Sequence, residues 1–263
     1  GADQAAVNAM RLVLSTVDMN GVIVIGEGEK DKAPMLFNGE KVGNGSEPDV
    51  DVAVDPIDGT RPLAFGRSNS LAMVALAPRG TMFDPGPFLY MNKLAVGPEA
   101  KGKIDIEKPI VENLRAIAKA KGKQIEDLTT IILDRPRHDD MVAEIRKAGA
   151  RIRQIPDGDV AAALMTSWSD SGVDVLLGIG GTPEGVITAC ALRAMGGEIQ
   201  GKLYARDESE LRRGREAGYD FDKVLTMHDL VSSEDVFFAT TGITDGELLK
   251  GVRYYGNHIT TDT

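Results

Sequence analysis

Short β-rich runs alternate with helical segments between residues 110 and 195, and this alternation constrains the fold more than any other sequence feature. Apolar spacing predicts these elements in order: helix 110–121, strand 130–133, helix 139–148, strand 151–155, an apolar run at 159–166, strand 173–177 and helix 183–195. Strands that alternate with helices are typical of βαβ units. We therefore expect an α/β protein with a largely parallel sheet in this region.

The first part of the chain is instead rich in strands, with glycine and proline at its turns. Its predicted elements are a helix from Ala2 to about Thr16 and strands over residues 22–25, 50–54, 71–77 and 88–96. No internal repeat or low-complexity linker is present in the sequence. The change from a strand-rich pattern to alternating strands and helices alone predicts one compact unit with a strand-rich half, residues 1–125, and a βαβ half, residues 126–263.

The charge balance excludes some classes of partner. The chain of 263 residues has 40 acidic and 30 basic side chains, which gives a formal net charge of −10. General nucleic-acid binders normally present a basic surface, so we expect no nucleic-acid partner. The apolar runs fall far short of the roughly 20 residues that span a bilayer, so we expect no membrane partner either.

The chain has a single cysteine, Cys190. It cannot form an internal disulfide, and its apolar helical surroundings predict a buried small hydrophobic side chain. The first residues lack the basic and apolar regions of a secretory signal. Together these features favour a cytoplasmic protein.

Three acidic clusters stand beside glycines at the ends of predicted strands. They are Gly26-Glu27-Gly28-Glu29, Asp55-Pro56-Ile57-Asp58-Gly59-Thr60 and Gly180-Gly181-Thr182-Pro183-Glu184-Gly185. Each alone is consistent with an ordinary turn, because aspartate, proline and glycine are turn residues. Crowded carboxylates repel one another unless a positive charge lies among them, so their joint occurrence favours a metal site. Mg²⁺ and Mn²⁺ prefer oxygen ligands, and the absence of histidine and cysteine disfavours zinc.

Two further motifs at strand ends favour binding of a phosphorylated ligand. Arg135 and Arg137, held apart by a proline, suit bidentate phosphate binding, although an exposed basic turn is an alternative. Asp157-Gly158-Asp159 suits sugar hydroxyls, with a local turn as the alternative. Tyr90, Asn92 and Lys93 are weaker candidates at another strand end. A catalytic role for His138 is disfavoured, because no acid or nucleophile is paired with it by spacing.

These motifs, in this order, resemble those of class II fructose-1,6-bisphosphatases. The resemblance is carried by Ile25-Gly26-Glu27-Gly28-Glu29, Asp55-Pro56-Ile57-Asp58-Gly59-Thr60, Arg135-Pro136-Arg137-His138, Pro156-Asp157-Gly158-Asp159, Gly180-Gly181-Thr182-Pro183-Glu184-Gly185 and Thr241-Gly242-Ile243-Thr244-Asp245-Gly246. The Asp-Pro-Ile-Asp-Gly-Thr motif is shared more widely with inositol monophosphatase-like, lithium-sensitive phosphatases.

The resemblance implies a layered α/β/α/β/α sandwich and a Mg²⁺- or Mn²⁺-dependent hydrolase, acting in gluconeogenesis, that removes the 1-phosphate of fructose 1,6-bisphosphate. It places the metal site in residues 1–125 and sugar-phosphate binding in residues 126–263. It implies metal ligands at Asp3, Glu27, Asp55, Asp58 and Glu184, and a threonine at Thr60 that orients the attacking water. Implied substrate contacts are Asp58, Gly59, Thr60, Tyr90, Arg135, Arg137, Asp157, Gly158, Asp159 and Gly181.

The family also has residues before Asp3, including a lysine near the site, and a tail after Thr263, so we expect this chain to be part of a longer protein. The resemblance further implies a homo-oligomer, such as a tetramer.

Three alternatives stay open at this point. A related bisphosphatase would act on sedoheptulose 1,7-bisphosphate, alone or as well. A nucleotide-using transferase would use Gly178-x-Gly180-Gly181 as a phosphate loop, but no Gly-Lys-Ser/Thr follows it. A metal-binding regulatory module without turnover would explain the acids but not Arg135 and Arg137.

Overall fold

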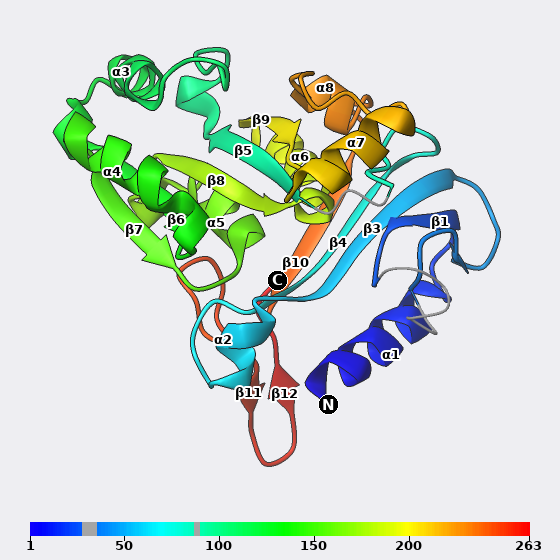
Figure 1. Cartoon of the computed structure of the whole chain (residues 1–263). Coiled ribbons are helices and arrows are strands. Elements are labelled where there is room, and N and C mark those ends of the chain that lie inside the picture. Colours follow the sequence, from blue (N-terminus) through cyan, green and yellow to red (C-terminus); the bar gives the residue numbers. More distant parts are fainter. Residues whose placement is uncertain (28–35, 87–89) are drawn as a thin grey trace. The chain divides into compact units, whose positions relative to one another are not determined.

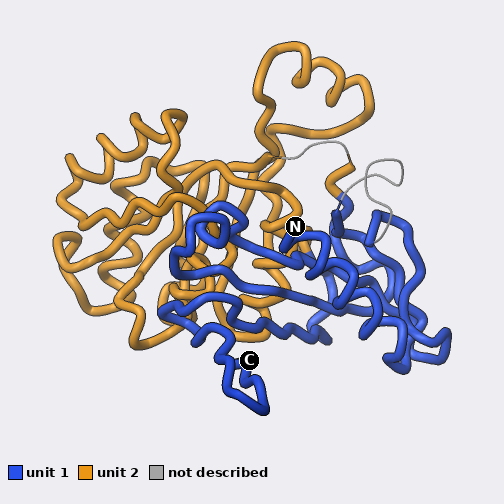
Figure 2. The backbone as a smooth tube through the Cα atoms, turned by 90° about the horizontal axis from the view of Figure 1, so that it is seen from below, with its two compact units in different colours: residues 1–84, 231–263 blue, residues 85–230 orange. Residues whose placement is uncertain are grey.

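The computed structural model describes residues 1–27, 36–86 and 90–263. These residues form two compact units, one of residues 1–84 and 231–263 and one of residues 85–230 (Figure 2). The first unit is therefore discontinuous in sequence, because residues 231–263 return to it after the second unit ends. Residue 125 lies inside the second unit, and the division into residues 1–125 and 126–263 stays a prediction.

The first unit contains a five-stranded mixed sheet with the order β10-β4-β3-β1-β2. Its strands are β1 (Asn20–Ile25), β2 (Lys41–Val42), β3 (Asp49–Asp58), β4 (Leu71–Pro78) and β10 (Phe237–Gly242). β1 runs parallel to β3, and the other neighbours are antiparallel. Helix α1 (Ala2–Leu14) packs on this sheet through Val7 and Leu14, as its apolar spacing predicts.

Two small elements complete the first unit (Figure 1). Helix α2 (Thr60–Ala64) follows β3, and β11 (Arg253–Tyr254) pairs with β12 (Ile259–Thr260) in a hairpin near the end of the chain.

Strand β3 is longer than predicted. The prediction that Asp55 follows the strand is wrong, because pairing with β4 continues to Asp58 across a bulge at Pro56 and Ile57. A bulge accommodates a proline, which has no N–H for the ladder. Burial does not alternate along β3, because residues 50–54 are all buried. Asp51 is 2% exposed, and it is accommodated because its Oδ2 accepts hydrogen bonds from the amides of Thr81 and Met82.

The second unit contains another five-stranded sheet, with the order β7-β6-β8-β5-β9. Its strands are β5 (Tyr90–Val96), β6 (Thr129–Leu133), β7 (Arg151–Ile155), β8 (Val175–Gly181) and β9 (Glu198–Leu203). β6 is parallel to both β7 and β8, as predicted. β5 runs antiparallel to β8 and β9, so the sheet is mixed rather than largely parallel.

The helices of the second unit include the three predicted at 110–121, 139–148 and 183–195 (Figure 1). The helices are α3 (Ile110–Lys121), α4 (Asp139–Ala148), α5 (Asp159–Met165), α6 (Thr182–Met195), α7 (Glu208–Glu216) and α8 (Met227–Leu230), with 3₁₀ turns at Pro98–Ala100, Ile125–Asp127, Pro136–His138 and Ser169–Ser171. Cys190 is fully buried in α6, which confirms its predicted structural role. No helix among the described residues is long and apolar enough to cross a membrane.

The connections around β6 define where a ligand site can form. From β6 the chain passes through α4 to β7 on one side, and from β7 through α5 to β8 on the other side of β6. Right-handed crossovers that leave in opposite directions put α4 and α5 on opposite faces of the sheet. The carboxyl ends of these strands therefore border a crevice at a topological switch point, where α/β proteins bind ligands.

Candidate active site

A pocket of about 350 Å³ lies at the carboxyl ends of the three parallel strands of the second unit. It brings together the residues that the sequence singled out after β6, β7 and β8, together with Tyr90 at the start of β5. The lining residues are Tyr90, Leu133, Arg135, Arg137, Asp157, Asp159, Gly180, Gly181, Pro183 and Glu184. The motifs that the sequence places after β6, β7 and β8 therefore lie at one edge of the sheet in the second unit.

The two arginines are held by main-chain carbonyl groups. Nη1 of Arg135 donates to the carbonyl of Asp134 at 2.8 Å. Nε and Nη2 of Arg137 donate to the carbonyl of Ile179 at 3.2 and 2.8 Å. A guanidinium has five N–H donors, so both side chains keep donors for an anion in the pocket.

Tyr90 lies near two guanidinium groups, those of Arg137 and Arg206, and the sequence motifs did not point to Arg206. The guanidinium carbon of Arg137 is 5.4 Å from the centre of the Tyr90 ring, and that of Arg206 is 5.8 Å from it. Arg206 is also paired with the buried carboxylate of Glu210, whose pKa is lowered mainly by this hydrogen bond. No motif surrounds Arg206, and only the turn between β9 and α7 brings it to Tyr90.

Asp159, which lines the pocket, forms a buried ion pair with Lys93 of β5. Nζ of Lys93 lies 2.7 Å from Oδ2 of Asp159, with Lys93 2% exposed. Gly180 lies against this pair, because a Cβ atom at Gly180 would overlap Asp159 Oδ2 and lie 3.1 Å from Lys93 Nζ. The prediction that β8 ends at Leu177 is wrong. β8 continues through Gly181 because glycines leave room for these side chains while pairing with β5.

Glu184 lies in the first turn of α6, after Pro183. Its Oε2 is buried and has no hydrogen-bond partner within the described part of the chain. Burial of the carboxyl, and then the nearby charge of Asp159, raise the pKa of Glu184. A Cβ atom at Gly181 would overlap this carboxylate, so glycine is required there for the observed rotamer.

The acids of the first unit lie at the end of β3. The amide of Ile57 donates to Oδ1 of Asp55 at 3.0 Å, and Asp58 is buried at 4% exposure. Gly59 then adopts a left-handed conformation, with φ 83°, and begins α2, whose first residue is the exposed Thr60.

The same local geometry recurs in the second unit. Gly158, with φ 85°, follows Asp157 and begins α5 at Asp159. In both places glycine permits the left-handed turn from a strand end into a helix. Asp-Gly therefore marks a strand-to-helix corner in each unit.

Glu27 and Asp3 are the remaining acids of the predicted metal set. Burial, and then the charge of Asp3, raise the pKa of Glu27. Gly28 and Glu29 of the same motif lie outside the described residues. Over residues 1–27, 36–86 and 90–263, no group of three or more histidine, cysteine, aspartate or glutamate side chains forms a ready metal-binding cluster.

The chemistry of these acids nevertheless fits a hard divalent cation. Glu184 has an unpartnered buried oxygen, and Glu27 has a like charge beside it. Both arrangements are unfavourable for carboxylates alone and favourable with a cation present. All five predicted ligands offer oxygen atoms, which Mg²⁺ and Mn²⁺ prefer.

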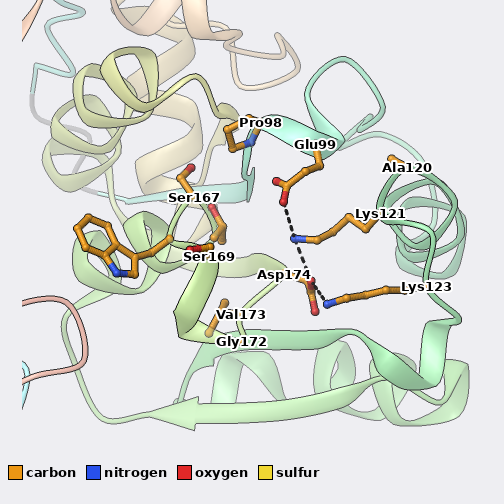
Figure 3. Close-up of a pocket in the computed structure, with 12 residues that line it drawn as sticks. Pro98, Glu99, Ala120, Lys121, Lys123, Ser167, Ser169, Gly172, Val173 and Asp174 are labelled. Atoms are coloured by element: carbon orange, nitrogen blue, oxygen red, sulfur yellow. Dashed lines mark hydrogen bonds and ion pairs between the residues drawn. The ribbon is translucent and has the colours of Figure 1, made fainter.

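A second and larger pocket of the same unit, about 440 Å³, holds none of the predicted site residues. It lies beside Asp174, just before β8 begins, and its charged side chains pair with each other (Figure 3). Nζ of Lys121 and of Lys123 lie 3.0 and 2.7 Å from Oδ1 of Asp174. We therefore assign this group a structural role.

The structure is that of an α/β protein with a strand-end pocket lined by arginine and carboxylate side chains. Residues 1–263 match the family model described as "Bacterial fructose-1,6-bisphosphatase, glpX-encoded". The chain is 50% identical over 275 aligned residues to "Fructose-1,6-bisphosphatase 1 class 2" of Escherichia coli (strain K12), covering 100% of this chain and 82% of that protein. "Fructose-1,6-bisphosphatase class 2" of Shigella flexneri matches with the same identity and coverage.

The chain belongs to the class II fructose-1,6-bisphosphatase family, whose members are phosphoric monoester hydrolases. The family resemblance noted from the sequence motifs is thereby confirmed.

Proposed function

We propose that this protein is a fructose-1,6-bisphosphatase that hydrolyses the 1-phosphate to give fructose 6-phosphate and phosphate, a step of gluconeogenesis. One observation carries the proposal. Arg135, Arg137, Asp157, Asp159 and Glu184 line one pocket at the switch point of the sheet. A pocket with both guanidinium donors and carboxylate acceptors suits a ligand that carries a phosphate and several hydroxyl groups.

In this proposal the protein side chains position the substrate. Arg135 and Arg137 hold the distal phosphate, with Tyr90 beside Arg137. Asp157, Gly158 and Asp159 contact the sugar, and Gly181 allows close approach of the ligand to the main chain. Asp58, Gly59 and Thr60 contact the reacting end. Fixing the substrate at both ends lowers the entropic part of the barrier.

We assign divalent-cation binding to Asp3, Glu27, Asp55, Asp58 and Glu184. When bound, Mg²⁺ or Mn²⁺ would lower the pKa of a water molecule and neutralise phosphoryl charge. The Thr60 hydroxyl orients the attacking water for an in-line displacement without a covalent enzyme intermediate.

The proposal extends to the fold, the location, the assembly and the partners of the protein. We propose that the fold is the α/β/α/β/α sandwich of the sugar phosphatases. The protein acts in the cytoplasm as a homo-oligomer, such as a tetramer, and binds neither nucleic acid nor membranes.

Phosphate release from fructose 1,6-bisphosphate, measured with and without Mg²⁺ or Mn²⁺, tests the reaction. We expect release only with a divalent ion. No release under any divalent ion would support the non-catalytic metal-binding module instead. A parallel assay with sedoheptulose 1,7-bisphosphate decides between a specific and a dual enzyme.

Glu184→Gln tests the metal assignment. The neutral amide removes a charged oxygen ligand, so the midpoint of the Mg²⁺ titration should move to higher concentration by about tenfold or more. Glu198→Gln, a change on β9 outside the pocket, is the control. An unchanged titration would remove Glu184 from the ligand set.

A further inference from the structure

The parallel ladder between β6 and β8 stops before either strand ends. Its pairs are Thr130 with Val175 and Ile131 with Leu176, although β6 continues to Leu133. The same register, continued, would pair Leu133 with Gly178. In a regular parallel ladder the amide of Ile179 would then donate to the carbonyl of Leu133.

The imidazole of His138 occupies the place of that missing hydrogen bond. Its Nδ1 lies 2.7 Å from the carbonyl oxygen of Leu133, and its Nε2 accepts the amide of Ile179 at 2.8 Å. The amide can only donate, so Nε2 carries no proton and Nδ1 donates to Leu133. His138 is fully buried, and its pKa is lowered by burial and by the charges of Arg137 and Arg135, opposed by its hydrogen bond to the Leu133 carbonyl.

The inserted ring replaces one hydrogen bond with two and so separates the strand ends by the width of an imidazole. Gly178 accommodates it, since a Cβ atom there would lie 3.1 Å from His138 Nε2. The pocket opens at this separation, between Leu133 of β6 and Gly180 of β8.

The same residue, Ile179, is also bound by the neighbouring arginine. Arg137 donates to the carbonyl of Ile179 while His138 accepts the amide of Ile179. The amide of His138 donates to the carbonyl of Arg135 at 2.9 Å, which closes the loop that carries both arginines. His138 therefore connects three parts of the pocket: the end of β6, the arginine loop and the end of β8.

We propose that His138 is a positioning residue, a wedge between β6 and β8 that holds the pocket open and fixes Arg135 and Arg137 for a phosphate group. The identity of that phosphate, the distal one of a sugar bisphosphate, rests on the proposed function. The wedge acts through the arginines, and it has no role in the chemical step.

Two substitutions separate this role from simple packing. His138→Leu fills similar space but leaves the Ile179 amide and the Leu133 carbonyl without the ring. His138→Gln keeps one donor and one acceptor. His258→Leu, at an exposed histidine of the first unit, is the matched control. Ile117→Ala, on the buried face of α3, measures the effect of lost stability alone.

Binding of fructose 6-phosphate, measured by calorimetry, is the first readout. We expect His138→Leu to weaken binding by about tenfold or more, and His138→Gln, His258→Leu and Ile117→Ala to stay within about threefold. The KM for fructose 1,6-bisphosphate should rise in His138→Leu by a larger factor than the KM for phenyl phosphate, which lacks a distal phosphate. A folded His138→Leu protein that binds fructose 6-phosphate normally would overturn the proposal.

The unsubstituted protein provides a test that does not depend on variant folding. Nitrogen-15 NMR of the His138 ring at neutral pH should show a neutral imidazole with the proton on Nδ1. A proton on Nε2, or a charged ring, would overturn the wedge, as would a wild-type protein that does not bind fructose 6-phosphate. Normal binding without hydrolysis would reject the proposed reaction and leave the role of His138 intact.

Discussion

Lys93 on β5 and Asp159 at the start of α5 form a buried ion pair, with Nζ and Oδ2 2.7 Å apart. The pair lies against the main chain of Gly180 and close to the buried carboxylate of Glu184. Asp159 thus has one carboxylate oxygen bound by a fixed cation, and its side chain also lines the pocket. This relationship leads to the first prediction.

Lys93→Met should destabilise the protein by about 3–5 kcal/mol, because removing one partner leaves a buried charge uncompensated. The double variant Lys93→Met/Asp159→Asn should recover most of that stability but not the hydrolysis of fructose 1,6-bisphosphate. Urea unfolding and phosphate release measure the two effects. Lys202→Met, which breaks a pair with the exposed Glu107, is the control and should change stability by less than about 1 kcal/mol. Equal effects at Lys93 and Lys202 would contradict the prediction.

Gly181→Ala should impair metal-dependent hydrolysis, because the added methyl group overlaps the Glu184 carboxylate and displaces it. We expect phosphate release to fall by about tenfold or more, with a higher Mg²⁺ concentration needed for half-maximal rate. Gly256→Ala is the control, since a Cβ atom at Gly256 meets no atom within 4 Å. Wild-type metal dependence in Gly181→Ala would show that the position of Glu184 does not matter.

Thr60→Ala should reduce turnover by about 10²–10⁴-fold, the range for loss of a group that assists proton transfer or orients water. Thr60 is exposed at the start of α2, so stability should stay within about 0.5 kcal/mol of wild type. Single-turnover kinetics and urea unfolding are the measurements, with the exposed Thr261→Ala as the control. Turnover within threefold of wild type would refute the role of Thr60 in positioning water.

Asp174→Asn should cost about 2–3 kcal/mol at pH 7, because the carboxylate accepts hydrogen bonds from Lys123, Lys121 and the amide of Thr129. Burial alone would raise the pKa of Asp174, but these bonds hold it below its ordinary value. A lowered folded-state pKa gives stability that is present above the unfolded pKa and lost as the pH falls through the folded pKa.

The stability difference between wild type and Asp174→Asn should therefore shrink as the pH falls below about 4. Urea unfolding at several pH values measures it. A difference that stays constant with pH would show that the carboxylate charge does not contribute.

Much of the second unit was predictable because local pattern and strand order agree there. The helix 110–121 and strands 130–133 and 151–155 were placed within a residue of their observed ends. The sequence did not predict strand β9 of the second unit or strand β10 of the first unit. β10 pairs with β4, which lies far away in the sequence, so no local pattern marks it.

The arginine and Asp-Gly motifs were recognisable because they stand directly after strands, and parallel strands bring such positions to one edge of a sheet. The roles of Lys93, Arg206 and His138 were not predictable in this way. Each role depends on a partner more than 40 residues away or on another element, as in Lys93 with Asp159 and His138 with Ile179.

The sequence by itself determined the alternation of strands and helices, the acid- and arginine-bearing strand ends and the family resemblance, because these depend on neighbours within a few residues. Only the tertiary structure decided the bulge in β3, the extension of β8 through its glycines and the insertion of His138 between β6 and β8. Those features depend on which strands pair and in what register, and on how closely one main chain can approach a side chain from another element.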